Sequence, residues 1–275
     1  MMASNSNADE ILVGGIGMWR SEDGGDSFQC IYNYGCGNYQ PMHVDMQDFR
    51  AFGDTYWAST DGGIYKSEDL FASQPEFMMK GIHGADFWGF GSGWNYDILV
   101  GGTFHNGVDV YCEDYPFGDF LDLGGGEPAS GYVNPGDSLR VYYVNQSRVV
   151  PPSLDGNIMS IPMGLAPNES PWFAESSEML FHPDCYNHIY LGSANQIFKS
   201  TNGGGNYTAI YDAPENTLVL DLDISRKAPK KMYAIVRSFS SGVSLHKTTD
   251  EWQTSTVLNI PAGGSSEGII SLDPE

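Results

Sequence analysis

The sequence predicts an all-β fold, a six-bladed β-propeller made of four-stranded antiparallel blades. One short turn motif recurs along the whole chain, and its copies are 41 to 48 residues apart. Glycine-rich turns separate segments of β type, and the sequence contains no long helical pattern. A period of ~40–50 residues with these features is typical of propeller blades. One sheet cannot bury both of its faces, whereas blades stacked around an axis can.

The clearest copy of the motif, residues 21–28, has the form Ser-x-Asp-x-Gly-x-Ser-aromatic. Residues 200–207 repeat it with Asn202 in place of the aspartate, and shorter copies lie at 66–71 and 247–252. Degenerate copies at 111–115 and 153–156 fill the gap between them. The aspartate or asparagine positions are separated by 46, 45, 41, 47 and 48 residues, and 48 more lead through the two termini back to Asp23. The chain therefore divides into six units, with the termini inside one of them.

A single domain, residues 1–275, accommodates these units as blades at about 8–35 plus 268–275, 41–82, 85–128, 130–163, 177–213 and 217–260. Patterns of β type predict the strands in order: 11–15, 17–21 and 27–31; 42–46, 55–59, 64–67 and 76–79; 87–90, 97–102, 108–111 and 120–123; 131–133, 140–144, 147–150 and 157–161; 178–184, 188–192, 196–199 and 207–210; 219–223, 231–236 and 255–258. Blade one then lacks its innermost strand. We expect 268–274 to supply that strand beside 11–15 and to close the ring, which leaves no open sheet edge there.

The net charge of −22 argues against nucleic acid and anionic membrane surfaces as partners, because both attract basic proteins. No apolar run is long enough to span a membrane. The polar N-terminus has no signal-peptide character, so an extracellular or cell-surface location requires a leader that this sequence does not contain. Cys30 and Cys36 are close enough in sequence to form a disulfide, whereas Cys112 and Cys185 are expected to be buried thiols.

The motif at 21–28 resembles the Asp-box, or BNR repeat, of sialidases, sortilin-type receptors, xyloglucanases and secreted bacterial repeat proteins. The resemblance covers essentially the whole chain and implies a propeller in which the box is structural. The residue chemistry agrees, because a short carboxylate or amide can bond the amides of its own turn and glycines supply positive φ. The structural positions are Ser21, Asp23, Gly25, Phe28, Asp69, Asp114, Asp155, Ser200, Asn202, Gly204, Tyr207, Asp250 and Trp252. Phe28, Tyr207 and Trp252 are expected to bury their rings between blades, and calcium binding at the acidic turns is the alternative role.

Sialidase activity is disfavoured because the chain lacks the arginine cluster and the signature that such a site needs. Hydrolysis of a neutral glycan needs two carboxylates, for which Asp45 and Asp86 are the candidates, with Asp48 and Asp97 nearby. His43 and Asp45 are expected on one strand face, where His83 or His105 from the next blade completes a metal site or a polar pair. Aromatic residues concentrate in blades two and three, where they stack on sugars or pack between blades. The expected ligand-binding residues are His43, Asp45, Trp88, Trp94 and His105.

Together these patterns predict a non-catalytic extracellular recognition or scaffold propeller without a cofactor, which binds a polysaccharide or a surface protein. A glycoside hydrolase and a structural module of a larger secreted protein are the alternatives. Because the turn motif marks the blade rim, we expect the ligand at the opposite ends of the strands. Propeller loops carry function while the blades carry stability.

Overall fold

The computed structural model confirms the predicted fold class. It describes residues 1–33, 36, 42–82, 87–103, 107–116, 119–124, 130–143, 146–165, 176–258 and 271–272. Within these ranges the regular structure is entirely β and forms six four-stranded antiparallel sheets, each with the size and strand order of a propeller blade. No helix long and apolar enough to cross a membrane occurs in the described part of the chain. The sheets belong to two compact units, Met1–Ala85 and Asp86–Glu275.

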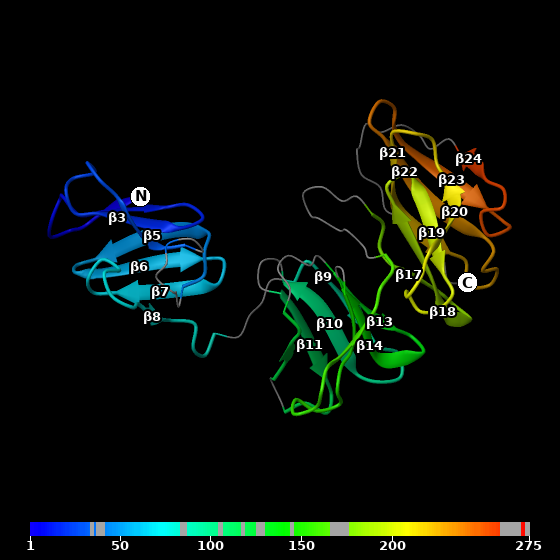
Figure 1. Ribbon diagram of the computed structural model, residues 1–275, viewed down its shortest axis with the longest axis horizontal. Coiled ribbons are helices and arrows are strands. Elements are labelled where there is room, and N and C mark those ends of the chain that lie inside the picture. The colour runs from blue at the N-terminus through cyan, green and yellow to red at the C-terminus, as the bar shows by residue number, and fades with distance from the viewer. Residues whose placement is uncertain are drawn as a thin grey trace. The chain divides into compact units, whose positions relative to one another are not determined.

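The first unit contains blades one and two. Blade one consists of β1 (Met2–Ala3), β2 (Ile11–Gly14), β3 (Met18–Ser21) and β4 (Gln29–Tyr32). Blade two consists of β5 (Met46–Phe52), β6 (Thr55–Thr60), β7 (Gly63–Ser67) and β8 (Glu76–Phe77). In each blade the strands pair in chain order, as Figure 1 shows for β5 to β8.

The second unit contains blades three to six (Figure 1). Blade three has β9 (Gly89–Ser92), β10 (Ile98–Thr103), β11 (Gly107–Cys112) and β12 (Leu121–Asp122), and blade four has β13 (Gly131–Asn134), β14 (Asp137–Tyr143), β15 (Gln146–Val149) and β16 (Met159–Ile161). Blade five has β17 (Leu180–His182), β18 (Cys185–Ser193), β19 (Gln196–Ser200) and β20 (Thr208–Asp212). Blade six has β21 (Thr217–Ile224), β22 (Met232–Ser238), β23 (Gly242–Thr248) and β24 (Thr256–Leu258). Strands again pair in chain order within every blade.

Apolar side chains from neighbouring blades form shared cores. In the first unit, Leu12 and Met18 of blade one pack with Phe49 and Tyr56 of blade two. The second unit has one cluster between blades three and four, a second between blades four and five, and a third between blades five and six. Burial of this kind supplies the main favourable free energy of folding. Each blade therefore packs against at least one neighbouring blade of its own unit.

Blade one has a complete set of four strands, which corrects the prediction that its innermost strand is missing from the N-terminal segment. β1 pairs with β2 through Met2↔Leu12 and Ala3↔Ile11. Two residues of alternating exposure carry too weak a β signal to be recognised in the sequence. The expected closing strand falls largely on residues 268–270 and 273–274, outside the described residues. Ser271 and Leu272 are not in a strand, so ring closure stays a prediction.

The first strand of blade two begins later than predicted. Residues 42–45 precede β5 and are not extended strand, and Asp45 has a left-handed backbone with φ of 64°. The amide of Asp45 donates to the carbonyl of Ile16 at 2.8 Å, so this corner connects blades one and two. His43 and Asp45 consequently do not share a strand face. The expectation failed because alternation in 42–46 looks like a strand until the left-handed residue breaks it.

Four copies of the repeated motif fold into the same hydrogen-bonded turn. We call them turn one (21–28), turn two (67–74), turn five (200–207) and turn six (248–255). In each, the first hydroxyl donates to the acid or amide oxygen two residues later at 2.8–3.0 Å, for Ser21, Ser67, Ser200 and Thr248. The same hydroxyl accepts the amide four residues on at 2.8–2.9 Å, from Gly25, Phe71, Gly204 and Trp252. The buried hydroxyl thus satisfies the backbone of its own turn.

Each of these turns contains two consecutive residues with positive φ. They are the glycine pairs Gly24–Gly25 and Gly203–Gly204 in turns one and five, but Leu70–Phe71 and Glu251–Trp252 in turns two and six. The left-handed region is unfavourable for residues with a Cβ. Phe71 and Trp252 nevertheless occupy the second position because their rings are buried in the core.

The aromatic residues of the motif therefore lie differently from the prediction. Trp252 stands at the position of Gly25, and its side chain is only 3% exposed. Phe28, at the end of turn one, is 45% exposed and does not bury its ring between blades. Tyr207 packs beside the cluster of Tyr142, Met179 and Ile189, as expected. Among the four turns of this chain, the hydrogen-bonded geometry is therefore more constant than the position of the aromatic ring.

Turns three and four depart from this geometry. Asp114 accepts a hydrogen bond from the Tyr96 hydroxyl at 2.5 Å, and buried Cys112 stands where the other turns have Ser or Thr. In the fourth turn Gly156 N donates to the Ser153 carbonyl at 3.0 Å, and Asp155 has no side-chain hydrogen bond to another described residue. Their sequences are degenerate because other contacts close these turns.

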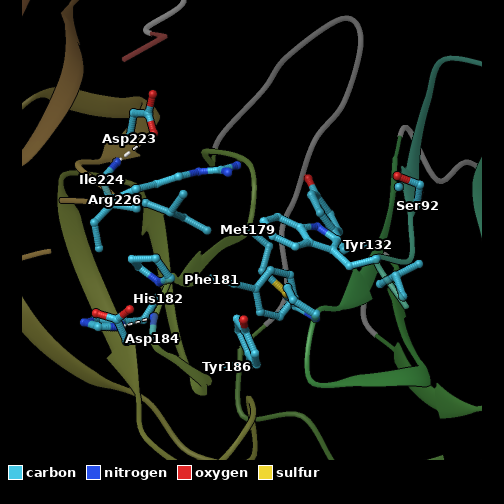
Figure 2. Close-up of a pocket in the computed structure, with 16 residues that line it drawn as sticks. Ser92, Tyr132, Met179, Phe181, His182, Asp184, Tyr186, Asp223, Ile224 and Arg226 are labelled. Atoms are coloured by element: carbon cyan, nitrogen blue, oxygen red, sulfur yellow. Dashed lines mark hydrogen bonds between the residues drawn. The ribbon is translucent and has the colours of Figure 1, made fainter. Parts of the chain in front are cut away.

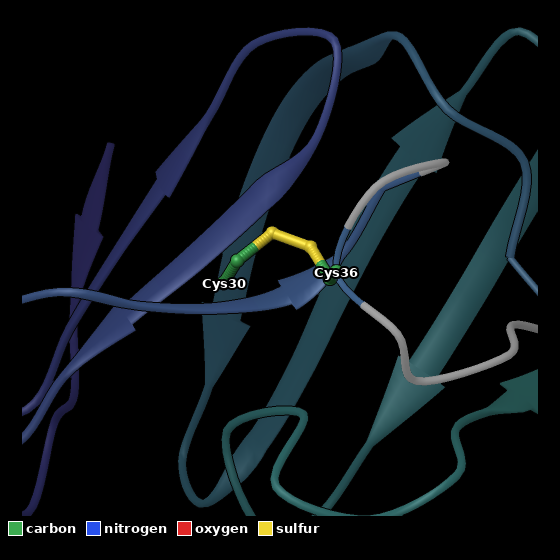
Figure 3. The surroundings of a disulfide bond; sticks show 2 residues. All are labelled: Cys30 and Cys36. Carbon is green, nitrogen blue, oxygen red and sulfur yellow. A yellow bond between two sulfur atoms is a disulfide. The ribbon is translucent and has the colours of Figure 1, made fainter.

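The first unit contains one disulfide, Cys30–Cys36, with 5.8 Å between the Cα atoms (Figure 3). The other two cysteines are free thiols. Cys112 is buried, as predicted, whereas Cys185 at the start of β18 is exposed, which corrects the expectation that both are buried. The pattern around Cys185 does not reveal that strand β18 begins outside the core.

Candidate functional site

The second unit contains a pocket of about 500 Å³. Its walls come mainly from the first strand of each of blades three to six and from the residues next to those strands, with Tyr186 added by β18. They are Gly91, Ser92 and Trp94; Tyr132, Val133 and Pro135; Met179 to Asp184 and Tyr186; and Asp223, Ile224 and Arg226. Four blades thus contribute to one concave site, whose size is in the ~300–1,000 Å³ range of ligand pockets.

The strand registers show at which end of the blades the pocket lies. In blade three Ser92 pairs with Leu99, which pairs with Tyr111 at the end of the third strand. In blade six Asp223 likewise pairs with Tyr233, and Tyr233 pairs with Lys247, the residue just before turn six. The pocket therefore lies at the strand ends that carry the turns. This pocket is at the other end of the blades from the ligand site expected from the sequence.

Blades three and four approach each other closely beside the pocket. A Cβ added to Gly91 would lie 2.6 Å from the carbonyl oxygen of Gly131, and one added to Gly131 would lie 2.9 Å from Val100 Cγ2. Both positions therefore require glycine. Their close packing brings the end of β9 against β13, so that residues of the two strands line the same wall.

The pocket is lined mainly by aromatic and apolar side chains. Met179 is a buried residue of the lining, and the ring of Phe181 packs on buried Tyr142 with centroids 5.6 Å apart. Tyr132 is half-buried, while Trp94 is 63% exposed at the edge. The flat faces of Trp94 and Phe181, together with the hydroxyl-bearing ring of Tyr132, suit ring-shaped polar ligands.

Arg226 and Asp223 bring opposite charges to the β21 side of the pocket. The Arg226 guanidinium lies 5.1 Å from the centroid of the Trp94 ring, a cation–π contact. Both carboxylate oxygens of Asp223 accept backbone amides, from Ile224 at 2.7 Å and from Leu272 at 2.7 Å. Figure 2 shows Arg226 extending from the β21 side towards Tyr132. Asp223 is thus engaged with the backbone, whereas the guanidinium faces the pocket.

His182 and Asp184 lie on the β17 side of the pocket. The Asp184 amide donates to Nδ1 of His182 at 3.1 Å, the bond drawn in Figure 2. Burial lowers the pKa of His182, and the Asp184 carboxylate opposes this shift only in part. The imidazole is therefore neutral at neutral pH, and Nε2 is available for a hydrogen bond with a ligand.

The structure separates the ligand-binding residues expected from the sequence. Trp94 lines the pocket, and Trp88 is exposed on blade three but does not line it. His43 and Asp45 belong to the first unit, where the His43 amide donates to the Tyr65 hydroxyl at 3.2 Å. His105 lies outside the described residues, as do Asp86 and His83. Among the described residues no group of three potential metal ligands comes together.

Most of the pocket residues were missed in the sequence. Tyr132, Phe181, His182 and Arg226 belong to three blades and are far apart along the chain. A signal was nevertheless present, because each of them lies in or directly after the first strand of its blade. Aligning the blades by that strand, instead of by the turn motif, would have brought these positions together.

Comparisons with known proteins place similarity at the level of the fold. No family model and no curated protein sequence matches the chain. Among solved structures it is similar to YCF48 bound to a D1 peptide, with 15% identity, a TM-score of 0.40, and coverage of 88% of this chain and 76% of that chain. It is also similar to the extracellular domain of a putative one component system from B. thetaiotaomicron, at 15% identity and a TM-score of 0.45.

That alignment covers 94% of this chain but 33% of the bacterial one, so the chain spans about a third of that protein's length. A xyloglucanase from Xanthomonas campestris is similar at 14% identity and a TM-score of 0.37, with 94% of this chain and 37% of that chain covered. These similarities concern the fold. The function has to be argued from the site.

Proposed function

We propose that this chain is a non-catalytic recognition domain that binds a polysaccharide or a surface protein in the pocket of blades three to six. The observation that carries the proposal is the convergence of four blades on one aromatic-lined concavity with a guanidinium beside it. A pre-formed pocket of this kind, mostly apolar with a few polar groups, is the usual form of a binding site.

We further propose that the chain is an Asp-box, or BNR-repeat, propeller in which the boxes are structural. The shared hydrogen bonds of turns one, two, five and six support this, because each motif hydroxyl bonds the acid or amide of its own turn. Groups already satisfied by the backbone have little capacity left for a ligand. The turns hold the third and fourth strands together, and no cofactor is needed for that role.

An extracellular or cell-surface location completes the proposal. The Cys30–Cys36 disulfide supports it, since such bonds persist in oxidising compartments and are rare in the cytosol. The chain is equally suited to be one module of a larger secreted protein.

A glycoside hydrolase is the second candidate, and the pocket supports it less well. Hydrolysis needs two carboxyl groups flanking the scissile bond. Asp223 and Asp184 are the acidic residues of the pocket lining, and both oxygens of Asp223 are occupied by backbone amides. Of the acids expected from the sequence, Asp45 is in the first unit and Asp86 is outside the described residues. The observations therefore favour binding over cleavage.

The test is a glycan array and a surface-protein pull-down, followed by titration calorimetry on the best ligand. Trp94→Ala and Phe181→Ala remove pocket rings, whereas Phe90→Ala removes an exposed ring of β9 that does not line the pocket. We expect the pocket variants to weaken binding by about tenfold or more and Phe90→Ala to leave it unchanged. Equal loss in all three variants, or turnover of a polysaccharide by the wild-type chain, would contradict the proposal.

A further inference from the structure

A cluster of basic residues adjoins the pocket in an otherwise acidic protein. Arg226, Lys227, Lys230 and Lys231 fall within the sequence Arg-Lys-Ala-Pro-Lys-Lys, although the whole chain has only 13 Lys and Arg and a net charge of −22. This segment connects β21 with β22 and continues directly from the pocket wall at Ile224. We call residues 226–231 the basic loop.

The charges of the basic loop are not neutralised within the described part of the protein. None of its four cations forms an ion pair with a described residue, whereas Arg20, Arg50, Lys66 and Lys199 each pair with a carboxylate. The chain has 35 acidic residues, so the absence of a described carboxylate beside these cations is not due to a shortage of acidic side chains. Uncompensated cations create a local positive potential that attracts anions within about 10 Å at moderate salt.

Arg226 connects this potential to the pocket. Its guanidinium stacks on Trp94 at 5.1 Å, which orients the planar group while leaving its N–H donors for a ligand. A guanidinium held in this way matches a carboxylate through two parallel hydrogen bonds. Asp184 lies on the His182 side of the pocket, apart from Arg226 in Figure 2, so it does not occupy this donor face.

We propose that the pocket selects an acidic polysaccharide, a chain containing uronic acids, whose carboxylate binds Arg226 while its sugar rings stack on the aromatic wall. This inference rests on the proposed recognition function and specifies its ligand. Sugar rings have apolar faces that fit Trp94, Tyr132 and Phe181, and polar edges that reach Ser92 and His182. The basic loop steers the charged chain towards the pocket.

The form of the pocket favours a saccharide over an acidic peptide. Peptides that bind to β-proteins commonly add a strand along an exposed sheet edge. Here the first strand of each blade is a sheet edge, but only two or three residues of each line the pocket, so an extended peptide finds no long continuous edge there. Several aromatic faces and one fixed guanidinium instead suit a rigid ring with a single carboxylate.

The experiment is titration calorimetry of the whole chain with oligosaccharides of polygalacturonate, alginate and hyaluronate. Each probe is paired with its methyl ester, which keeps the sugar rings and removes the charge. Arg226→Gln removes the proposed carboxylate partner. Arg237→Gln is the matched control, because Arg237 stacks on Phe239 at 5.5 Å at the other end of β22.

We expect at least one uronate to bind, its ester to bind about tenfold or more weakly, and Arg226→Gln to weaken the acid by a similar factor with no effect of Arg237→Gln. Lys227→Gln with Lys230→Gln should reduce the salt dependence of binding. Equal binding of acid and ester, lost in Trp94→Ala, overturns acid selectivity and leaves the recognition function standing. Binding of a polyglutamate peptide and of no uronate overturns the saccharide and leaves a protein ligand. Failure of every probe overturns the acidic ligand, and the glycan array and pull-down then decide separately whether the recognition function stands.

Discussion

Ser27 engages both carboxylate oxygens of Asp23. Its amide donates to Oδ1 at 2.9 Å and its hydroxyl to Oδ2 at 2.5 Å. The hydrogen bonds from Ser27, with a further one from Ser21, lower the pKa of Asp23 to about 2. Thr254 binds Asp250 of turn six in the same way and lowers the pKa of that carboxyl. Ionised carboxylates are thus part of the turn structure.

Acid should therefore unfold the protein through its turns. Because the folded pKa of Asp23 is depressed, its contribution to stability is fully present above the unfolded value of 3.8 and is lost as the pH falls towards about 2. We expect urea unfolding to show a steep loss of stability between pH 4 and pH 2. Asp23→Asn should flatten this dependence, since turn five already has Asn202 at the same position.

Asp26→Asn is the matched control for that measurement. Asp26 is exposed in the same turn and takes no part in its hydrogen bonds. An equal effect of both substitutions on the acid slope would show that overall charge, and not the turn, sets the pH dependence.

Gly24→Ala should destabilise the first unit by about 1–2 kcal/mol, since φ at this position is 74° and alanine disfavours that region. An added Cβ would meet nothing closer than Asp9 Oδ1 at 3.4 Å, so the cost is conformational and not steric. Gly15→Ala is the comparison, because that Cβ meets no atom within 4 Å and no positive φ is required there. Thermal unfolding that shifts equally for both variants would contradict this account.

Trp252→Ala should cost about 3–5 kcal/mol, although it removes the largest side chain from a left-handed position. The ring packs in the core of blades five and six, 4.8 Å from the ring of Tyr211. Phe28→Ala, at the exposed end of turn one, should cost about 1 kcal/mol or less. Chemical denaturation measures the free energy of unfolding of both variants. A larger loss for Phe28→Ala than for Trp252→Ala would contradict the alignment in which Trp252 corresponds to Gly25.

His246 should make blade six sensitive to mild acid. Its buried ring bonds the Tyr211 hydroxyl at 2.6 Å and the Ser244 hydroxyl at 3.0 Å, and burial lowers its pKa. A depressed histidine pKa means that stability is lost as the pH falls below the unfolded value of 6.5. His246→Gln should reduce the slope of unfolding free energy between pH 7.5 and 5, leaving the part due to His182. A slope that does not change would refute this assignment.

The blades were predictable because they repeat. The strands of blades four and five were predicted within a few residues, since alternation and the spacing of the turns agree there. β1 was not recognised, because two residues have no periodicity of their own and form a strand only when β2 pairs with them. The strand predicted at 42–46 was wrong for the same reason, since the left-handed backbone of Asp45 accompanies a hydrogen bond to Ile16 of the neighbouring blade.

The pocket was predictable only in part. Trp94 was singled out as a ligand-binding residue and lines the pocket. Phe181, His182 and Arg226 were not, because nothing local distinguishes them from other residues near strand ends. The basic loop was visible in the sequence as a run of charge, but its position beside Trp94 was not.

The all-β class, the six units and the turn motif follow from local patterns, because hydrogen bonds and backbone preferences within about eight residues do not depend on distant parts of the chain. Local patterns do not show which strand ends converge, which aromatic residues are buried and which cation contacts an aromatic ring. These depend on the packing of one blade against the next, through contacts such as Gly91 with Gly131 that join residues distant in the chain. Long-range packing leaves no periodic signature, so the site had to be found in space.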